Sequence, residues 1–392
     1  MNNTFLLGPV CATLLLGLIG CGGSDGGGSG ENSIVEINGD AEPTLVANLP
    51  NAVAIAAGWT HSCAVDGNGQ AWCWGNNEYG QLGCLGDLPR KRDIPYTDTP
   101  CAVAPIASSM VFGSIASHRS VTCSLDLTGN AFCWGYGIPF EPLREPIGPT
   151  PVDTTEQFTI LRAAMADTDM CGLTATGERY CWGTGETTAE RLVAEFKDDN
   201  GHQFVDIALS QRWGCGVTGD IEAWCWGSNW FGQLGGGTVG QFEGPLESQL
   251  PVKVVGDRSY RTIDAGLMQT CALDTEDAAW CWGLTADGQA YGTPQSVPGD
   301  NRFDKIFTGS QFACGLTNNG QAWCWGNNEH GQLGNASYQD SAVPIPVVGG
   351  LYFSSLALGG YHACGITTDQ QLYCWGGNDF GQLGQPIKNE RI

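Results

Sequence analysis

The residues in this sequence best suited to chemistry are its cysteines, which recur in pairs. Seven pairs share a separation of ten residues, and the second cysteine always lies in an aromatic-Cys-Trp-Gly phrase. Nine intervening residues do not fit the short Cys-x₂₋₄-Cys chelating turn of a zinc site, so we expect disulfides, no metal and no cofactor. The predicted pairs are Cys63 with Cys73, Cys123 with Cys133, Cys171 with Cys181, Cys215 with Cys225, Cys271 with Cys281, Cys314 with Cys324, and Cys364 with Cys374.

Turn-forming residues between the paired cysteines predict the element that positions them. The stretch 66–69 reads Asp-Gly-Asn-Gly and is flanked by β-forming residues, as in a β-hairpin. Two cysteines placed symmetrically about such a turn face each other, with Cβ atoms about 4.5–5.5 Å apart. By alternation along the strand, Trp72 and Trp74 then point to the face opposite Cys73. Each repeat should therefore show aromatic rings on one face and sulfur on the other, as packing between repeats requires.

The cysteine count predicts an oxidising compartment. If Cys11 leaves with a signal segment and Cys21 is acylated, Cys84 and Cys101 form an eighth pair and no thiol remains. Disulfides this numerous persist outside the cytosol. The loop between Cys84 and Cys101 carries the basic run 90–92. This loop could contact an acidic partner, or the disulfide could simply keep a surface loop compact.

The first residues are typical of a targeting segment. The apolar stretch 5–19 is shorter than the roughly 20 residues that a membrane-spanning helix needs, and it ends in Leu-Ile-Gly-Cys21, which resembles a bacterial lipobox. The match lacks a basic residue near the start, and a proline interrupts the apolar run. We expect residues 1–20 to be a signal peptide and 21–42 a lipidated N-terminus with a Gly/Ser linker. The glycine after Cys21 favours an outer-membrane lipoprotein of the cell envelope; the alternative is an ordinary cleaved signal.

No residues are arranged as catalysis would require. His61 and His362 occupy the same position of the repeat, where Trp213 and Phe312 stand in other copies. We therefore expect both histidines to be packed or hydrogen-bonded. Ser62 lies beside His61, but neighbours in sequence do not define a triad. Outside the Gly/Ser-rich stretch that follows Cys21, the sequence has no Gly-x-Ser-x-Gly, P-loop or His-Glu-x-x-His motif, and we expect a protein that is not an enzyme.

Four copies of the repeat continue into a longer shared phrase of the form Asn-Asn-Glu-Tyr-Gly-Gln-Leu-Gly. The copies span residues 76–83, 228–235, 327–334 and 377–384. This repeat resembles that of the regulator of chromosome condensation (RCC1) family, whose known members are seven-bladed β-propellers. The resemblance implies an all-β, seven-bladed propeller over residues 43–385, with one intra-blade disulfide per blade and a C-terminal tail over 386–392. The second, third and fifth copies depart from the family in lacking the Gln-Leu-Gly phrase, and the nuclear members lack the cysteine pairs.

A propeller avoids long open edges by closing on itself. Each shared phrase is followed by an extended segment that is often led by proline, but too few residues follow Gly384 to supply one for the last blade. A matching segment, Pro-Thr-Leu-Val, begins at Pro43 ahead of the first blade. We therefore predict that residues 43–49 add a strand to the last blade and close the ring.

The most variable part of the repeat is a pair of residues between the position of Gly58 and that of His61. Its flanks are regular, whereas the pair itself mixes aromatic, basic, acidic and apolar side chains. Equivalent positions of a propeller form a ring on one face, and such a mixture resembles a binding surface; the alternative is a set of unconstrained loop tips. The candidate binding residues are Trp59, Arg119, Asp167, Arg212, Met268, Gln311 and Tyr361.

The charge of the chain limits the class of partner. A formal net charge of −24 with only 17 Lys and Arg residues would repel nucleic acid. We expect a monomeric, lipid-anchored, extracytoplasmic module that binds an unknown protein or peptide and meets the membrane only through its lipid. The alternatives are guanine nucleotide exchange, known for the nuclear member of the family that the chain resembles, and a hydrolase or lyase on a propeller.

Overall fold

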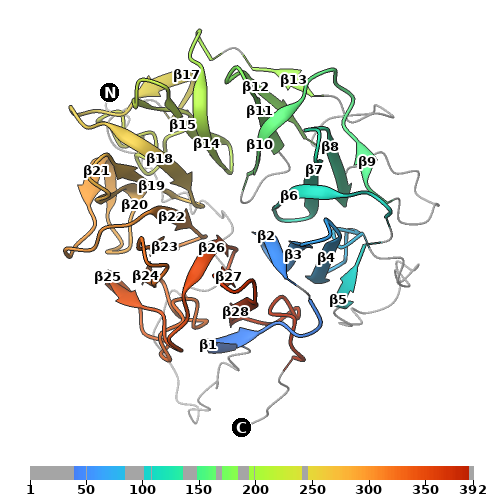
Figure 1. The fold of residues 1–392 in the computed structure, drawn as a ribbon. Helices are drawn as coiled ribbons and strands as arrows, with labels where there is room; N and C mark the ends of the chain where they lie inside the picture. Colours follow the sequence, from blue (N-terminus) through green and yellow to red (C-terminus); the bar gives the residue numbers. More distant parts are fainter. Residues whose placement is uncertain are drawn as a thin grey trace, which may run out of the picture. The chain divides into compact units, whose positions relative to one another are not determined.

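The computed structural model describes residues 39–49, 51–83, 101–106, 108–135, 148–164, 170–183, 194–197, 199–240 and 246–387. In this part of the chain, 28 strands form seven four-stranded antiparallel sheets, arranged as blades around a central axis (Figure 1). The all-β, seven-bladed propeller is thereby confirmed. The predicted signal segment and Cys21 lie outside the described residues. No helix within the ranges given above is long and apolar enough to cross a membrane.

Each blade runs from an inner strand near the axis to an outer strand at the rim. The first three blades are β2 (Ala52–Ala57), β3 (His61–Asp66), β4 (Ala71–Gly75) and β5 (Cys101–Pro105); β6 (Phe112–Ser117), β7 (Val121–Asp126), β8 (Ala131–Gly135) and β9 (Thr150–Pro151); and β10 (Phe158–Ala163), β11 (Met170–Thr174), β12 (Arg179–Trp182) and β13 (Glu195–Phe196). The fourth and fifth are β14 (Phe204–Ser210), β15 (Trp213–Thr218), β16 (Ala223–Ser228) and β17 (Glu247–Lys253); and β18 (Tyr260–Ala265), β19 (Gln269–Asp274), β20 (Ala279–Leu284) and β21 (Ala290–Ser296). The sixth and seventh are β22 (Lys305–Thr308), β23 (Phe312–Leu316), β24 (Ala322–Gly326) and β25 (Ser341–Pro346); and β26 (Phe353–Leu358), β27 (His362–Thr367), β28 (Leu372–Gly377) and β1 (Gly39–Leu45).

The paired cysteines lie directly opposite each other on the second and third strands of every blade. Their Cα atoms are 4.0–4.1 Å apart, and all seven predicted pairs are confirmed as disulfides. From the first blade to the last, the disulfides join Cys63 to Cys73, Cys123 to Cys133, Cys171 to Cys181, Cys215 to Cys225, Cys271 to Cys281, Cys314 to Cys324, and Cys364 to Cys374. On the chain-entropy model, closing a loop of about ten residues contributes at most roughly 2.5–3 kcal/mol each. Cys84 and the side chain of Cys101 lie outside the described part of the chain, so the eighth pair stays a prediction.

Neighbouring blades pack the sulfur face of one sheet against the aromatic face of the next. At the first junction, the disulfide between Cys63 and Cys73 shares a buried cluster with Phe112 and Trp134 of the second blade. A disulfide meets a tryptophan of the following blade in the same way at all seven junctions. A main-chain hydrogen bond also crosses each junction, as from the N–H of Phe112 to the hairpin carbonyl of Gly69 (2.9 Å). The repeat therefore builds the interfaces between blades as well as the blades themselves.

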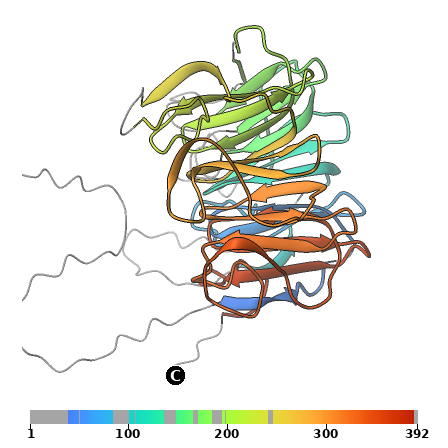
Figure 2. The ribbon, with the colours of Figure 1, turned by 90° about the vertical axis from the view of Figure 1, so that its left-hand side faces the viewer.

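The N-terminal strand closes the ring. β1 pairs antiparallel with β28, with Thr44 opposite Cys374, and forms the outer strand of the last blade. In two views at right angles, β1 (blue) lies beside the strands of that blade (red) (Figures 1 and 2). Val46 and Leu49 follow β1 and are buried in the cluster that joins the last blade to the first. The predicted closure by residues 43–49 is confirmed.

The closing strand begins and ends earlier than the sequence predicts, at residues 39–45 rather than 43–49. The linker was expected to extend to residue 42, but β1 begins at Gly39. The register of β1 against β28 shifts between Asp40 and Thr44, and Pro43 in this stretch has no N–H to donate to the ladder. Gly39 and Asp40, the first residues of β1, are held by main-chain pairing with β28. Their side chains show no hydrophobic alternation, so a strand could not be predicted there.

Candidate functional site: the loop face

Two kinds of connection share one side of the propeller, which we call the loop face. In an up-and-down blade, the turn from the first to the second strand and the segment after the third strand lie on the same side. The hairpin between the second and third strands and the link to the next blade lie on the other, here called the hairpin side. The variable pairs belong to the first kind of turn, as Trp59 does between β2 and β3. Six of the seven variable pairs therefore lie on the loop face. The seventh, which includes Asp167, lies outside the described residues.

The six described candidate residues on the loop face are all accessible, though not equally. Exposed are Arg119, Arg212, Gln311 and Tyr361, and half-buried are Trp59 and Met268. The residues that flank the first pair, Gly58 and His61, are buried. Packing therefore constrains the flanks of a pair far more than the pair itself, which accounts for the contrast between regular flanks and irregular pairs in the sequence.

Closure of the ring brings together aromatic rings from three blades at one point of the loop face. Trp59 of the first blade and Tyr361 of the seventh meet edge to face, with ring centroids 5.7 Å apart and planes at 78°. His330, from the segment after β24 in the sixth blade, has its ring centroid 4.7 Å from that of Tyr361. Burial and, next, the carboxylate of Glu329 raise the pKa of Tyr361. We call Trp59, Glu329, His330 and Tyr361 the aromatic corner.

A glycine allows the two largest rings of the aromatic corner to meet. Gly360 precedes Tyr361, and a Cβ atom at this position would lie 2.9 Å from the carbonyl oxygen of Trp59 and 3.1 Å from its ring atom Cδ2. Contacts under 3.0 Å to backbone require something to shift. A side chain at Gly360 would therefore push the seventh blade's turn away from Trp59 and separate the rings.

The shared phrase of the repeat forms a clasp between consecutive blades. In the clasp that carries His330, the Asn328 side chain accepts the N–H of Leu333 (2.9 Å), and the Gln332 side chain accepts the N–H of His330 (2.8 Å). The Gln332 carbonyl accepts the indole N–H of Trp375 in the next blade (3.0 Å). Equivalent bonds join Trp74 to Gln382 (2.8 Å) and Trp282 to Gln233 (2.9 Å). The clasp is therefore part of the scaffold, and it fixes the backbone that presents His330 to the corner.

The two histidines at the repeated position are buried and hydrogen-bonded, as predicted. Nε2 of His362 lies 2.8 Å from the hydroxyl of Ser62 in the next blade, and Nε2 of His61 lies 3.0 Å from that of Thr122. The Ser62 hydroxyl donates its proton to the carbonyl of Gln382 (2.9 Å), so the imidazole must donate to the serine. An imidazole in that role cannot take the serine proton, and this pair is not arranged to activate a nucleophile. Burial lowers the pKa of both histidines to about 3.

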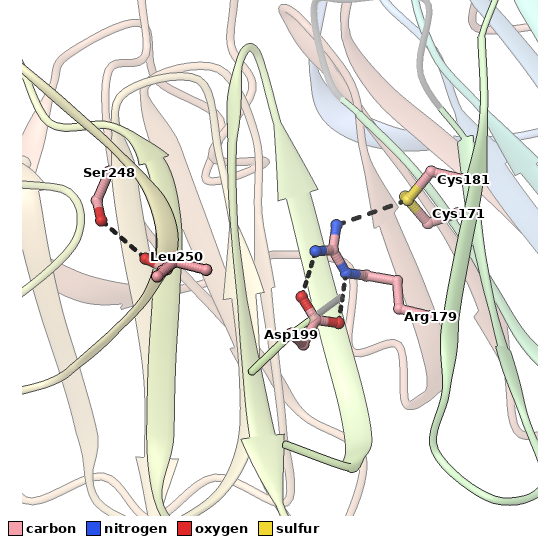
Figure 3. A network of polar contacts seen from close by, with 6 residues as sticks. All are labelled: Cys171, Arg179, Cys181, Asp199, Ser248 and Leu250. Carbon is pink, nitrogen blue, oxygen red and sulfur yellow. Dashed lines mark hydrogen bonds and ion pairs between the residues drawn. A yellow bond between two sulfur atoms is a disulfide. The ribbon is translucent and has the colours of Figure 1, made fainter. Parts of the chain in front are cut away.

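The third blade contains a buried ion pair that the sequence analysis missed (Figure 3). Nε of Arg179 donates to Oδ2 of Asp199 (2.9 Å), a second guanidinium nitrogen bonds Oδ1, and a third lies 3.6 Å from the sulfur of Cys181. The guanidinium carbon lies 4.1 Å from the ring centroid of Trp226 in the fourth blade. Five other blades have alanine at the position of Arg179 and the last has leucine. This single departure from an apolar residue was the available signal, and the third blade is one of those without a clasp.

The types of side chain that the loop face presents favour contacts with another molecule rather than metal binding. No group of three or more His, Cys, Asp or Glu side chains among them is placed to hold a metal ion. The arrangement on the loop face consists instead of aromatic, basic and amide side chains around a ring, which can make hydrophobic, cation–π and hydrogen-bonding contacts with another molecule.

Two models of the regulator of chromosome condensation (RCC1) repeat match the chain, over residues 52–81, 303–332 and 353–382 and over residues 68–125 and 319–366. Human WBSCR16 is similar in structure, with a TM-score of 0.66 and 17% identity over 84% of this chain and 87% of that one. Yeast RCC1 (Prp20), solved with Kap60, gives a TM-score of 0.63 and 20% identity, covering 83% and 80%. The ectodomain of the Arabidopsis thaliana receptor kinase ACR4 gives 0.52 and 18%, covering 87% and 99%.

Among curated proteins, the chain is 29% identical over 85 residues to a bifunctional serine/threonine-protein kinase/NEDD4-like E3 ubiquitin-protein ligase of Dictyostelium discoideum. The match covers 22% of this chain and 4% of that protein. The structural similarities, all at 20% identity or less, show the fold alone, whereas the repeat models match the first two and the last two blades directly. The chain is thus a seven-bladed β-propeller whose first two and last two blades match the repeat of the regulator of chromosome condensation (RCC1) family.

Proposed function

We propose that this protein is an extracytoplasmic, lipid-anchored binding module that docks a protein or peptide on its loop face. The observation that carries the proposal is the contrast, within each described turn, between two buried flanks and a pair with at least one accessible residue. The scaffold already accounts for the disulfides, the clasps and the buried histidines. The variable pairs, which include aromatic and arginine side chains of the kind that dominate binding energies, are left without a structural role.

Capture of a partner by the purified protein tests the loop-face proposal. The test variant changes five residues to alanine: Trp59, Arg119, Arg212, Met268 and Tyr361. The matched control changes five exposed apolar residues outside the variable pairs to alanine: Val111, Leu127, Val205, Ile221 and Tyr352. We expect the test variant to lose a specific partner that the original protein and the control both retain. Equal capture by the test variant and the original protein would refute docking on this face.

The cellular location is a separate part of the proposal, and it rests on the lipobox-like sequence at Cys21 and on the disulfides. The similarity in fold to a receptor-kinase ectodomain is consistent with a propeller of this kind working outside the cytosol. Labelling with palmitate in cells tests the anchor. We expect label in the original protein and none in Cys21→Ala; equal label in both would contradict acylation at this residue.

A further inference from the structure

Three cationic side chains of this protein are held in the same way, by a tryptophan ring and a carboxylate at once. The guanidinium carbon of Arg258 lies 3.3 Å from the ring centroid of Trp280, and one of its nitrogens lies 3.3 Å from Oδ2 of Asp274. The other two sets are Arg179 with Trp226 and Asp199, and Lys253 with Trp224 and Glu222. In this chain, an aromatic face next to an acid is thus a recurrent site for a cation.

The aromatic corner has aromatic rings and a carboxylate but no cation between them. Tyr361 is 38% exposed, Glu329 is exposed, and Trp59 and His330 are half-buried. Within the described part of the chain, no lysine or arginine stacks on Trp59 or Tyr361, and Glu329 forms no ion pair. The corner therefore presents solvent-accessible aromatic surface and a carboxylate whose charge no cation of these residues neutralises.

We propose that the aromatic corner binds the guanidinium group of an arginine side chain on the partner, with its plane against Tyr361 and its charge beside Glu329. Cations are attracted to aromatic faces by the ring quadrupole. Arginine is preferred to lysine because its planar group stacks on a ring while its N–H groups reach a carboxylate. The net charge of −24 also attracts basic partners. The inference rests on the proposed function and gives the loop face one defined point of recognition.

A titration with a single amino acid derivative tests the corner without a partner protein. The probe is N-acetyl-arginine amide, and the matched control is N-acetyl-citrulline amide, which has nearly the same shape and no charge. The readout is the NMR ring signals of the chain's five histidines. We expect the His330 signals to shift to saturation with the arginine probe and not with the citrulline probe. Those of the fully buried His61 and His362 should stay in place.

Two variants and a control locate the binding. Tyr361→Gln copies Gln311, the residue at this position in the sixth blade, and Glu329→Gln removes the charge. Each should weaken the apparent affinity about fivefold or more. Tyr352→Gln makes the same change at an exposed tyrosine outside the variable pairs and should leave the affinity unchanged. Unmoved buried-histidine signals verify that each variant is folded.

The corner proposal is overturned if the His330 signals do not move, if they move equally with citrulline, or if Tyr361→Gln binds the arginine probe as tightly as the original protein. These outcomes are separate from those of partner capture. If the titration fails but the five-alanine variant loses capture, the arginine site at the corner is refuted and docking on the loop face stands. If the arginine probe shifts the His330 signals specifically but the five-alanine variant still captures the partner, the arginine site stands and docking on the loop face is refuted.

Discussion

We expect the propeller to lose about 4 kcal/mol of unfolding free energy between about pH 7 and about pH 5, because His61 and His362 are buried in their neutral form. Burial lowers the pKa of each imidazole from 6.5 to about 3, and for His61 the nearby His118 and His362 lower it further. In the unfolded chain, a histidine titrates at about 6.5. As the pH falls, the unfolded chain therefore binds protons first. This stabilising contribution is complete above about pH 6.5 and is lost steadily down to about pH 3.

The magnitude follows from the position of the two pKa values. One pKa unit corresponds to about 1.4 kcal/mol. A pH of about 5 lies about 1.5 units below the pKa of a histidine in the unfolded chain, so each buried histidine costs about 2 kcal/mol of stability at that pH. Both residues are fully buried, so little of this effect is screened by solvent.

Urea denaturation at a series of pH values, with the disulfides intact, measures the effect. The matched variant combines His362→Phe with Ser62→Ala and so copies Phe312 and Ala363, which pack together at the junction of the sixth and seventh blades. It should lose about 2 kcal/mol over the same interval instead of about 4, because one titrating group remains. Carboxyl groups titrate alike in both proteins and cancel in the comparison. The same loss in both proteins would refute the assignment to buried histidines.

Three further predictions concern the scaffold. Deleting residues 31–50 removes the outer strand of the last blade and should lower the melting temperature sharply, so an unchanged melting curve would count against the closure. Arg179→Ala leaves the charge of Asp199 buried without its partner and should cost about 3–5 kcal/mol in urea denaturation; a loss below about 1 kcal/mol would show that the pair is dispensable. Gly334 (φ +65°) and Gly350 (φ +66°) share a backbone conformation. A Cβ atom at Gly334 would lie 2.7 Å from an indole nitrogen of the next blade, whereas a Cβ atom at Gly350 would meet no other atom within 4 Å. Gly334→Ala should therefore destabilise more than Gly350→Ala by about 1–3 kcal/mol, and equal losses would refute a tight clasp.

Much of the scaffold could be predicted because its information is local and repeated. Ten-residue spacing and turn residues predicted the pairing of Cys63 with Cys73, since a hairpin brings both together within a few residues. Closure by residues 43–49 followed from counting outer segments. The start of β1 at Gly39 could not be predicted, because main-chain hydrogen bonds hold it and any residue except proline can supply those.

Less of the candidate site than of the scaffold could be predicted. Its positions could be proposed because the pair that includes Trp59 varies between regular flanks. The aromatic corner was missed, since Trp59 and Tyr361 are about 300 residues apart and meet only when the ring closes. The partner of Arg179 was missed for a related reason: Asp199 lies in a link outside the repeat phrase, and no spacing rule connects the two.

Hydrogen–deuterium exchange of the protein with its captured partner locates the docked surface. If the partner docks on the loop face, exchange should slow in the variable turns of that face and stay unchanged in the hairpins of the opposite side. The turns to follow lie at residues 59–60, 119–120, 211–212, 267–268, 310–311 and 360–361. Protection confined to the hairpin side, with these turns exchanging as fast as in the free protein, would contradict binding on the loop face.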